Sequence, residues 1–341
     1  MSIVGAFDVH RRQLTFDYLD TVSGEVKRGR VAPADREHLR AWLARFAGQD
    51  EVQFALEGCT GWRYVVEELV AAGIEPHLAE PADTAALRGR KRHAKTDKSD
   101  ARHLRVHLMA GDLPESWIPP GHVLETRAVV RLYKDLLDER GGWQQRIAAT
   151  LFHQGAPLSA SVAVAEGRAP AGQAGLSAAG RQAVETGLCQ VERLSAGLDP
   201  LRAQLGLLAR RQPGCCALRA AHYGIGPVTA VVVWAELGDA RRFSSSDDVI
   251  RHTGLDITVY SSDAKRSAGH LSRQGPGLPR WALYESAKCA ARPASPDYGY
   301  YTAFRARRGA GLATLSVARK LARRCYHTLR ELGEDALAPA A

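Results

Sequence analysis

Short apolar runs separated by turn residues follow one another through the N-terminal part of the chain. Runs of this length are typical of β-strands, whereas apolar residues three and four apart indicate helices. The pattern predicts strands at Ile3 to Val9, Gln13 to Leu19, Gly24 to Val31, Val52 to Leu56 and Ile74 to Leu78, with helices from about Ala34 and from Trp62 to Ala72. Strands and helices in this arrangement predict an α/β domain.

The order of these elements, three strands and then helix, strand, helix and strand, is that of the ribonuclease-H fold. By analogy with that fold, the first and fourth strands are neighbours in one sheet. Asp8 stands at the end of the first strand, and Glu57 follows the fourth. The analogy therefore predicts that these two carboxylates lie side by side.

Two further acids, Asp97 and Asp100, stand three residues apart where a helix is expected to start, so they share one helical face. Carboxylates gathered in one place repel each other unless a divalent cation neutralises them, and oxygen ligands favour Mg2+ or Mn2+. Each acid alone is explained as a strand end, a helix cap or a surface residue. All four acids within one segment of domain size favour a metal site.

Cations surround the second pair of acids. The segment 88–107 holds Arg88, Arg90, Lys91, Arg92, Lys95, Lys98, Arg102 and Arg105, with His93, His103 and His107 among them. In the whole chain 46 Lys and Arg residues outnumber 37 Asp and Glu residues, so the formal charge is +9. Such an excess suits a polyanionic partner such as nucleic acid.

We expect phosphate contacts from two groups of cations. One group is Arg88, Arg90, Lys91 and Arg92; the other, near the C-terminus, is Arg305, Arg307, Arg308, Arg319, Lys320, Arg323 and Arg324. The alternative for the second group is the solvated face of a helix that packs through its apolar side.

The middle of the chain has a helical period. Residues 124–151 are expected to form a long helix interrupted at Gly141-Gly142, and a stretch rich in Ala, Gly and Ser separates it from a second apolar period between Val184 and Leu208. This spacing predicts a coiled-coil-like pair of helices. Such a pair packs on itself, dimerises or braces a nucleic-acid strand, and the sequence does not choose between these roles.

The C-terminal third is expected to be mainly α-helical. It opens with the turn Gly224-Ile225-Gly226 before the apolar run Val231 to Trp234. A Gly-x-Gly turn that enters a helix resembles the helix-hairpin-helix element, whose backbone amides bind a DNA phosphate. In this chain the amides would be those of Gly224 and Gly226, and an ordinary turn is the simpler explanation.

The length of the chain allows more than one domain, at roughly 100 to 200 residues per domain. We expect an α/β metal-binding domain at 1–112, a helical linker at 113–212 and a C-terminal domain at 213–341.

The stretch from Thr253 to Gly275 is polar, basic and rich in hydroxyl groups. It holds Ser261, Ser262 and Ser272, with Lys265 and Arg266 between them. A serine here is either a nucleophile or an ordinary loop residue. Because serine is common in loops, the residues alone favour the second explanation.

Cysteine usage and hydropathy bear on the compartment. The six cysteines, Cys59, Cys189, Cys215, Cys216, Cys289 and Cys325, form no Cys-x-x-Cys pair and have no His-rich metal spacing, so we expect free thiols in a reducing compartment. No apolar run reaches the roughly 18 residues of a membrane span, and the N-terminus lacks a signal-peptide pattern. The sequence predicts a cytoplasmic protein without membrane contact, and its 45% hydrophobic content excludes wholesale disorder.

Several of these features together resemble the IS110 family of insertion-sequence transposases, the DEDD recombinases guided by a bridge RNA. The resemblance rests on Asp8, Glu57, the string Lys95-Thr96-Asp97-Lys98-Ser99-Asp100-Ala101, the turn Gly224-Ile225-Gly226 and the block from Gly254-Leu255 to Ser262. It spans nearly the whole chain, and the string with a correctly ordered Asp and Glu upstream is its most specific part.

The resemblance implies an N-terminal domain like that of the Holliday-junction resolvases of the RuvC type, with Asp8, Glu57, Asp97 and Asp100 binding Mg2+. It also implies the partners: donor and target DNA, a noncoding bridge RNA, and further copies of the chain as dimers that join into a tetramer.

The C-terminal domain implied by the resemblance is a transposase domain with a nucleophilic serine. That serine attacks a DNA phosphodiester and becomes joined to one end of the broken strand. Alignment from Gly254-Leu255 identifies it as Ser262, with the adjacent Ser261 as the alternative and Ser272 as a third candidate. Lys265 and Arg266 would steady the phosphate.

The residues are also compatible with two other functions. A metal-dependent nuclease similar to a junction resolvase would use the same four carboxylates with water as its nucleophile, and would not require the C-terminal third. A basic nucleic-acid-binding scaffold would tolerate neutralisation of Asp8 and Glu57, but it gives no reason for four acids inside a basic surface.

Overall fold

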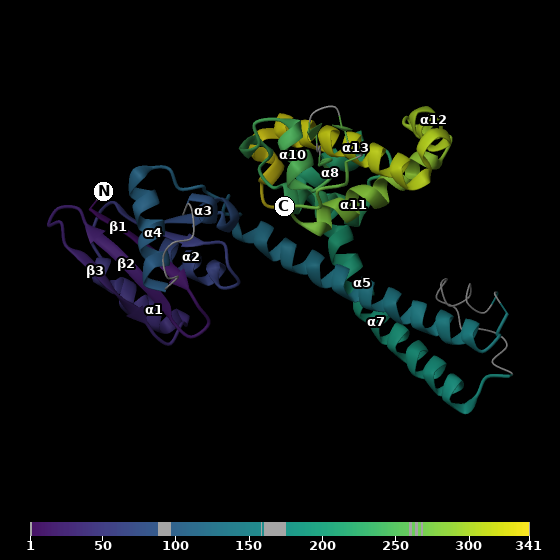
Figure 1. Ribbon diagram of the computed structural model, residues 1–341, viewed down its shortest axis with the longest axis horizontal. Coiled ribbons are helices and arrows are strands. Elements are labelled where there is room, and N and C mark those ends of the chain that lie inside the picture. The colour runs from purple at the N-terminus through teal and green to yellow at the C-terminus, as the bar shows by residue number, and fades with distance from the viewer. Residues whose placement is uncertain are drawn as a thin grey trace. The chain divides into compact units, whose positions relative to one another are not determined.

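The computed structural model of the 341-residue chain describes residues 2–87, 97–157, 159, 175–258, 261–262, 265–266 and 269–340. The chain forms two compact units, Met1–Ile118 and Pro119–Ala341, which are described in turn (Figure 1). The long helices of the expected middle segment belong to the same unit as the C-terminal helices.

The first unit is built on a five-stranded sheet in the order β3-β2-β1-β4-β5. Its strands are β1 (Ile3–Val9), β2 (Leu14–Asp20), β3 (Val26–Val31), β4 (Val52–Glu57) and β5 (Glu75–Ala79). β1 pairs antiparallel with β2 and parallel with β4, which confirms that the first and fourth strands are neighbours. The ends of every predicted strand lie within two residues of the ends of the observed strand.

The helices of this unit are α1 (Arg36–Leu43), the short 3-10 turn η1 (Ala44–Phe46), α2 (Trp62–Ala71), α3 (Pro81–Leu87) and α4 (Asp97–Ala110). α1 and α2 are joined by ion pairs: the buried carboxylate of Glu68 on α2 accepts hydrogen bonds from Arg36 and Arg40 on α1. The two helices therefore form one layer over the sheet, and their apolar residues enter the same core.

Alternation of side chains divides the sheet into two faces. On the face covered by α1 and α2, Phe7, Phe16 and Phe54 pack around Trp42 in an aromatic core, with the Phe7 and Phe54 ring centroids 4.9 Å apart. Gly5 lies against the Phe54 ring, where a Cβ would clash with it. Large rings on this face thus require a glycine in the central strand.

The opposite face is lined by small side chains and is covered by α4. Val4 and Ala6 of β1 and Ala55 of β4 pack against Leu104 and Leu108 of that helix. α4 therefore covers this face and packs on β1, β2 and β4.

A buried ion pair fixes α4 on this face. Asp17 of β2 is 1% exposed and accepts hydrogen bonds from Arg105 of α4 and, at 2.5 Å, from Arg28 of β3. Its place in the basic segment 88–107 predicts that Arg105 faces a polyanion. The structure shows instead that its side chain is buried against Asp17, which leaves it unavailable to a phosphate.

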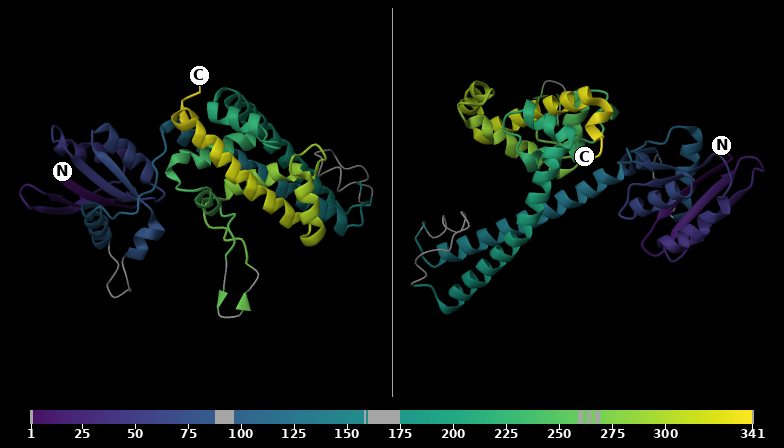
Figure 2. Two further views of the ribbon diagram at one scale, coloured as in Figure 1. Left: turned by 90° about the horizontal axis from the view of Figure 1, so that it is seen from above. Right: turned by 180° about the vertical axis from the view of Figure 1, so that it is seen from behind.

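The second unit begins with two long helices, α5 (Gly121–His153) and α7 (Ala178–Arg211), which run side by side as a hairpin (Figure 2). Ile147 and Val184 belong to their shared core, so the two predicted helices do pack on each other, whereas a coiled-coil geometry stays a prediction. The predicted interruption at Gly141-Gly142 is wrong, because α5 is continuous through both glycines. Glycine costs a helix interior only about 1 kcal/mol per residue, and packing against α7 outweighs that cost.

The remaining helices are α8 (Pro213–Ala221), α9 (Pro227–Leu237), α10 (Ser246–His252), α11 (Gly277–Ala287), α12 (Tyr298–Arg308) and α13 (Ala310–Leu332), with the 3-10 turns η2 (Ala240–Arg242), η3 (Lys288–Ala291) and η4 (Gly333–Leu337). α9 lies at their centre, and every residue from Ala230 to Leu237 is buried. The indole N–H of Trp234 donates a 2.6 Å hydrogen bond to the carbonyl of Ala336. The C-terminal part is mainly α-helical, as predicted.

All six cysteines are free thiols, as the sequence predicted. Burial raises the pKa of the Cys215 and Cys325 thiols well above its usual range, so neither is a nucleophile at neutral pH. Across the described ranges, no helix combines the length and apolar character that a membrane span requires.

Asp17→Ala should lower the free energy of unfolding by about 3–5 kcal/mol, because it leaves the Arg105 guanidinium buried without this carboxylate. Urea unfolding followed by circular dichroism measures the loss. Asp17→Leu combined with Arg105→Met should restore most of it, because apolar groups of similar size then replace both charges.

Glu25→Ala is the matched control in the same unit. Glu25 is largely exposed and lies 3.3 Å from Lys27, so its removal should cost less than about 1 kcal/mol. Equal losses for Asp17→Ala and Glu25→Ala would contradict the anchoring role of Asp17.

Candidate metal centre

Strand alternation directs Asp8 and Glu57 to one face of the sheet. Ala6 and Ala55, two residues earlier on β1 and β4, pack against α4, so the two acids face the same helix. The last pair of the parallel β1–β4 ladder joins the residues immediately before them. Neighbouring strands are about 4.8 Å apart, so both carboxylates extend from adjacent backbone positions.

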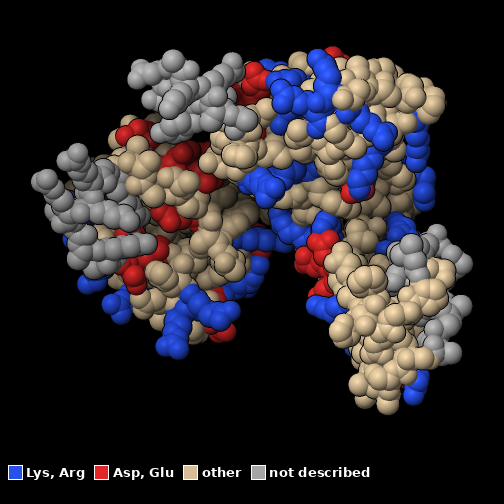
Figure 3. Space-filling view, turned by 45° about the vertical axis from the view of Figure 1, so that its right-hand side comes forward, with Lys and Arg blue, Asp and Glu red and all other residues tan. Residues whose placement is uncertain are grey.

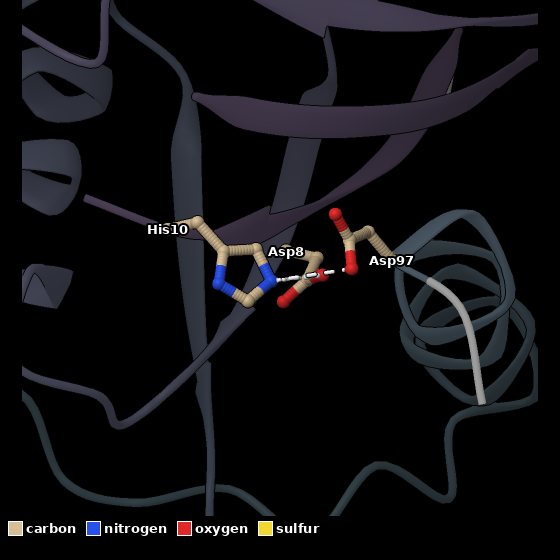
Figure 4. Close-up of side chains that lie close together, drawn as sticks. All are labelled: Asp8, His10 and Asp97. Atoms are coloured by element: carbon tan, nitrogen blue, oxygen red, sulfur yellow. Dashed lines mark hydrogen bonds and ion pairs between the residues drawn. The ribbon is translucent and has the colours of Figure 1, made fainter. Parts of the chain in front are cut away.

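α4 begins at Asp97 and brings a third acid to this edge of the sheet. Nε2 of His10 lies 3.0 Å from Oδ2 of Asp8 and 3.5 Å from Oδ1 of Asp97 (Figure 4). One ligand atom from each of these three residues lies within 4.8 Å of the other two. Gln13 donates a 3.3 Å hydrogen bond to the second oxygen of Asp97 and helps to orient it.

Electrostatic repulsion acts on Asp8. Burial raises the pKa of its carboxyl, His10 lowers that pKa through its charge and hydrogen bond, and the nearby Asp100 and Asp97 raise it again. Asp100 is therefore close enough to Asp8 to influence its ionisation. A divalent cation placed among these groups would offset the cost of burying a charged carboxylate and would relieve the repulsion between the carboxylates.

The donor set fits such a cation. Carboxylate oxygens suit Mg2+ and Mn2+, and an imidazole nitrogen is a donor that transition metals accept more readily than Mg2+ does. Of the four acids identified in the sequence, Asp8 and Asp97 come together, Asp100 lies near enough to act on Asp8, and Glu57 extends from the adjacent strand position.

His10 is a candidate ligand that sequence reasoning missed. The signal was present, because His10 follows Asp8 by two residues at the end of a strand, and that spacing places both side chains on the same face. The sequence does not reveal that Asp97, far along the chain, lies beside it.

The proposed nucleophile lies in a β-ribbon of the second unit (Figure 2). β6 (Ser261–Ser262) pairs antiparallel with β7 (Lys265–Arg266), so Ser262 is in register with Lys265, and Ser261 with Arg266. At the root of the ribbon, the Ser272 hydroxyl donates a hydrogen bond to Asp256. This contact gives Ser272 a structural role.

The cations assigned to phosphate binding differ in their surroundings. Arg88, Arg90, Lys91 and Arg92 lie outside the described residues. On α13, Arg319 donates to the carbonyl of Leu255, Arg323 pairs with Asp247, and Lys320 and Arg324 pair with Asp297. These contacts account for the α13 cations without a phosphate.

The cations at the end of α12 are exposed. Arg305, Arg307 and Arg308 lie in its last turn, and no Asp or Glu occurs in the sequence from Tyr298 to Arg330. Figure 3 shows adjoining Lys and Arg side chains, in blue, on the face in view. The cations of this helix end therefore fit the expected phosphate contacts better than those of α13.

The Gly224-Ile225-Gly226 turn joins α8 to α9. Gly224 has φ +90° and lies against the backbone of Ser286 on α11, where a Cβ would clash. The amide of Ile225 donates to the carbonyl of His222, and the amide of Gly226 donates to the Thr229 hydroxyl at 3.0 Å. These contacts give the turn a packing function, and phosphate binding by its amides stays a prediction.

Two family models match the chain. A transposase model of the DEDD IS110 type matches residues 6–153, and the model of the transposase IS116/IS110/IS902 family matches residues 217–302. A family 20 transposase of Pseudomonas aeruginosa is 25% identical over 79% of this chain and 81% of its own length. A protein of Sinorhizobium fredii named transposase y4rJ is 28% identical over 64% of this chain, which spans 60% of that relative's length.

These matches agree with the position of the candidate residues. The first contains all four acids of the sheet edge together with His10, and the second contains the glycine turn and the β6–β7 ribbon. The first match thus covers the metal-site candidates, and the second covers the candidate nucleophile. The chain belongs to the IS110 family of transposases.

Proposed function

We propose that this chain is a DNA transposase that cuts and rejoins DNA at a divalent-metal site held by Asp8, Glu57, Asp97 and Asp100, with His10 as a further ligand. The observation that carries the proposal is the convergence of Asp8, His10 and Asp97 in a member of a transposase family. Mg2+ is the expected ion and Mn2+ the alternative, because carboxylate oxygens supply most of the donors.

A divalent ion at this site would polarise the scissile phosphate and stabilise the charge that develops in the transition state. The protein holds the donors in place from three elements. β1 positions Asp8 and His10, β4 positions Glu57, and the first turn of α4 positions Asp97 and Asp100. A similarity of this unit to RuvC-type resolvases is part of the proposal, supported by the strand order and the edge-sharing acids.

Ser262 is the proposed nucleophile. Its hydroxyl oxygen would attack the phosphorus of a DNA phosphodiester, the bond from phosphorus to one sugar oxygen would break, and the serine proton would pass to that leaving oxygen. The resulting phosphoserine retains the free energy of the broken bond for joining to a new end. The second family match and the register of Ser262 with Lys265 support this assignment.

The proposed partners are donor and target DNA, a noncoding bridge RNA that supplies sequence recognition by base pairing, and further copies of the chain in dimers and tetramers. Family membership and the +9 charge support a nucleic-acid partner. In guided systems the protein mainly reads backbone and shape.

The alternative function is a resolvase-like nuclease with water as the nucleophile. The observation in its favour is that Asp8, His10 and Asp97 all lie in the first unit, which would supply the metal site without the β6–β7 ribbon. This alternative gives no function to residues 217–302, which the second family model matches.

Asp8→Asn should abolish metal-dependent cleavage and raise the melting temperature in EDTA. The folded pKa of Asp8 is raised, so its ionised form costs stability above that pKa, and the cost decreases as pH falls through it. Asn removes the charge at every pH. Calorimetry should show that MgCl2 raises the melting temperature of the wild type but not of the variant. Cleavage at the wild-type rate by Asp8→Asn would refute the metal assignment.

His10→Ala should weaken Mn2+ binding by about 10- to 100-fold and Mg2+ binding less, because the variant loses the nitrogen donor. Isothermal titration calorimetry measures both ions. His38→Ala is the matched control: His38 is an exposed histidine of the same unit that lies 2.8 Å from Asp35, outside the site. Identical affinities for His10→Ala and the wild type would remove His10 from the ligand set.

Ser262→Ala should lose both cleavage and a covalent protein-DNA adduct. The adduct is expected on denaturing gels after the wild type is mixed with guide RNA and a DNA substrate nicked near the cut. Ser261→Ala and Ser272→Ala should retain some of both, since Ser272 is bound to Asp256 at the ribbon root. Cleavage without an adduct, at the same rate in Ser262→Ala as in the wild type, would refute the recombinase function and favour the nuclease function.

A further inference from the structure

One side of α12 carries aromatic and cationic side chains in a row. Tyr300, Phe304 and Arg307 follow at spacings of four and three residues, which place them in one stripe of the helix. The Tyr300 and Phe304 ring centroids are 6.1 Å apart, and the Arg307 guanidinium lies 5.8 Å from the Phe304 ring. Lys320 of α13 lies 3.9 Å from the Tyr300 ring. These four residues are called the α12 ladder below.

The α12 ladder lies at the surface. Tyr300 is 39% exposed, Arg307 is exposed, and the Lys320 side chain is 38% exposed. α12 packs on α13 and η3 and lies at one end of the helical unit (Figure 1). The Tyr300 hydroxyl forms a 2.6 Å hydrogen bond with Ser316 of α13, which fixes the orientation of the ring. The ladder thus presents partly exposed rings in defined positions.

The charge around the ladder is positive. Arg305 and Arg308 extend from the same end of α12 as Arg307. Cations in the last turn of a helix are stabilised by the negative end of the helix dipole, which explains their location. The dipole does not explain the aromatic rings beside them. Arginine and aromatic rings together form the surface on which bases stack and phosphates are neutralised.

We propose that the α12 ladder binds unpaired nucleotides of a nucleic-acid strand, with bases stacked on Tyr300 and Phe304 and phosphates held by Arg305, Arg307 and Arg308. A duplex keeps its bases stacked on each other, so exposed rings select a single strand or a loop. This inference deepens the proposed function by naming the form of strand, and it rests on that function for nucleic acid as the partner. It involves neither the metal site nor Ser262.

Binding is measured by fluorescence anisotropy with the full-length chain in EDTA, which prevents cleavage. The probes are labelled poly(U) RNA, poly(dT) DNA and a duplex DNA. The variant Tyr300→Leu/Phe304→Leu should lose single-strand affinity by roughly 5- to 150-fold for each base that loses its stacking partner. Its duplex affinity and salt dependence should stay unchanged, because no charge is removed.

The variant Arg305→Gln/Arg308→Gln has a different expected signature. It should lower the salt slope for single strands by about 0.7 for each lost phosphate contact. It should weaken duplex binding as well, because phosphates are common to both forms. The two variants therefore separate stacking from charge.

Tyr298→Leu is the matched control. Tyr298 lies on the same helix with nearly the same exposure, 37%, but two residues from Tyr300, and residues so spaced do not share a helix face. Its binding should equal that of the wild type. Tyr300→Phe should also bind normally, because it keeps the ring and loses only the hydroxyl bonded to Ser316.

The outcomes are distinguishable. Tighter binding to poly(U) assigns the strand to RNA, tighter binding to poly(dT) assigns it to DNA, and either supports the inference when the double Leu variant loses it. Unchanged affinity in that variant, or an equal loss in Tyr298→Leu, overturns it. If the double variant folds poorly by circular dichroism, Tyr300→Leu alone decides the question. A wild-type chain that binds none of the probes would instead count against the proposed function.

Discussion

The candidate metal centre depends on a buried ion pair that is not part of it. Arg105 on α4 and Asp17 on β2 meet in the interior, and Arg28 binds the same carboxylate from the next strand. A helix is stiff, so fixing residue 105 also sets the position of Asp97, which at 1.5 Å per residue lies about 12 Å along the axis. The apolar contacts of α4 are non-directional. The ion pair is directional, and it therefore accounts for the particular position from which Asp97 reaches His10 and Asp8.

The site gathers groups that repel one another. Asp8 is partly buried and lies near two other carboxylates, so its ionised form is unfavourable in the protein alone. His10 offsets part of this, and its hydrogen bond to Asp8 orients both side chains toward Asp97. The arrangement is poor for stability and good for binding a cation, which is the balance expected where side chains are placed for function.

Cations close together in the sequence have different surroundings in the structure. Arg319, Arg323 and Arg324 of α13 are bound to the Leu255 carbonyl, Asp247 or Asp297. The cations at the end of α12 face solvent beside aromatic rings, and Arg307 among them donates to the Ala303 carbonyl of its own helix. Net charge predicts a polyanionic partner for the whole chain. Pairing and exposure show which residues of these two helices are available to it.

Much of the fold and part of the site followed from the sequence. Apolar run lengths located all five strands within two residues, and the order of elements placed Asp8 and Glu57 on neighbouring strands. The break expected at Gly141-Gly142 failed because packing between α5 and α7 outweighs the local cost of glycine. The sequence by itself determined where the five strands form and which four acids are candidate metal ligands, because both follow from residue type and local spacing. Only the tertiary structure decided that His10 joins Asp8 and Asp97 and that Arg105 is buried, because distances between residues far apart in the chain depend on how α4 packs on the sheet.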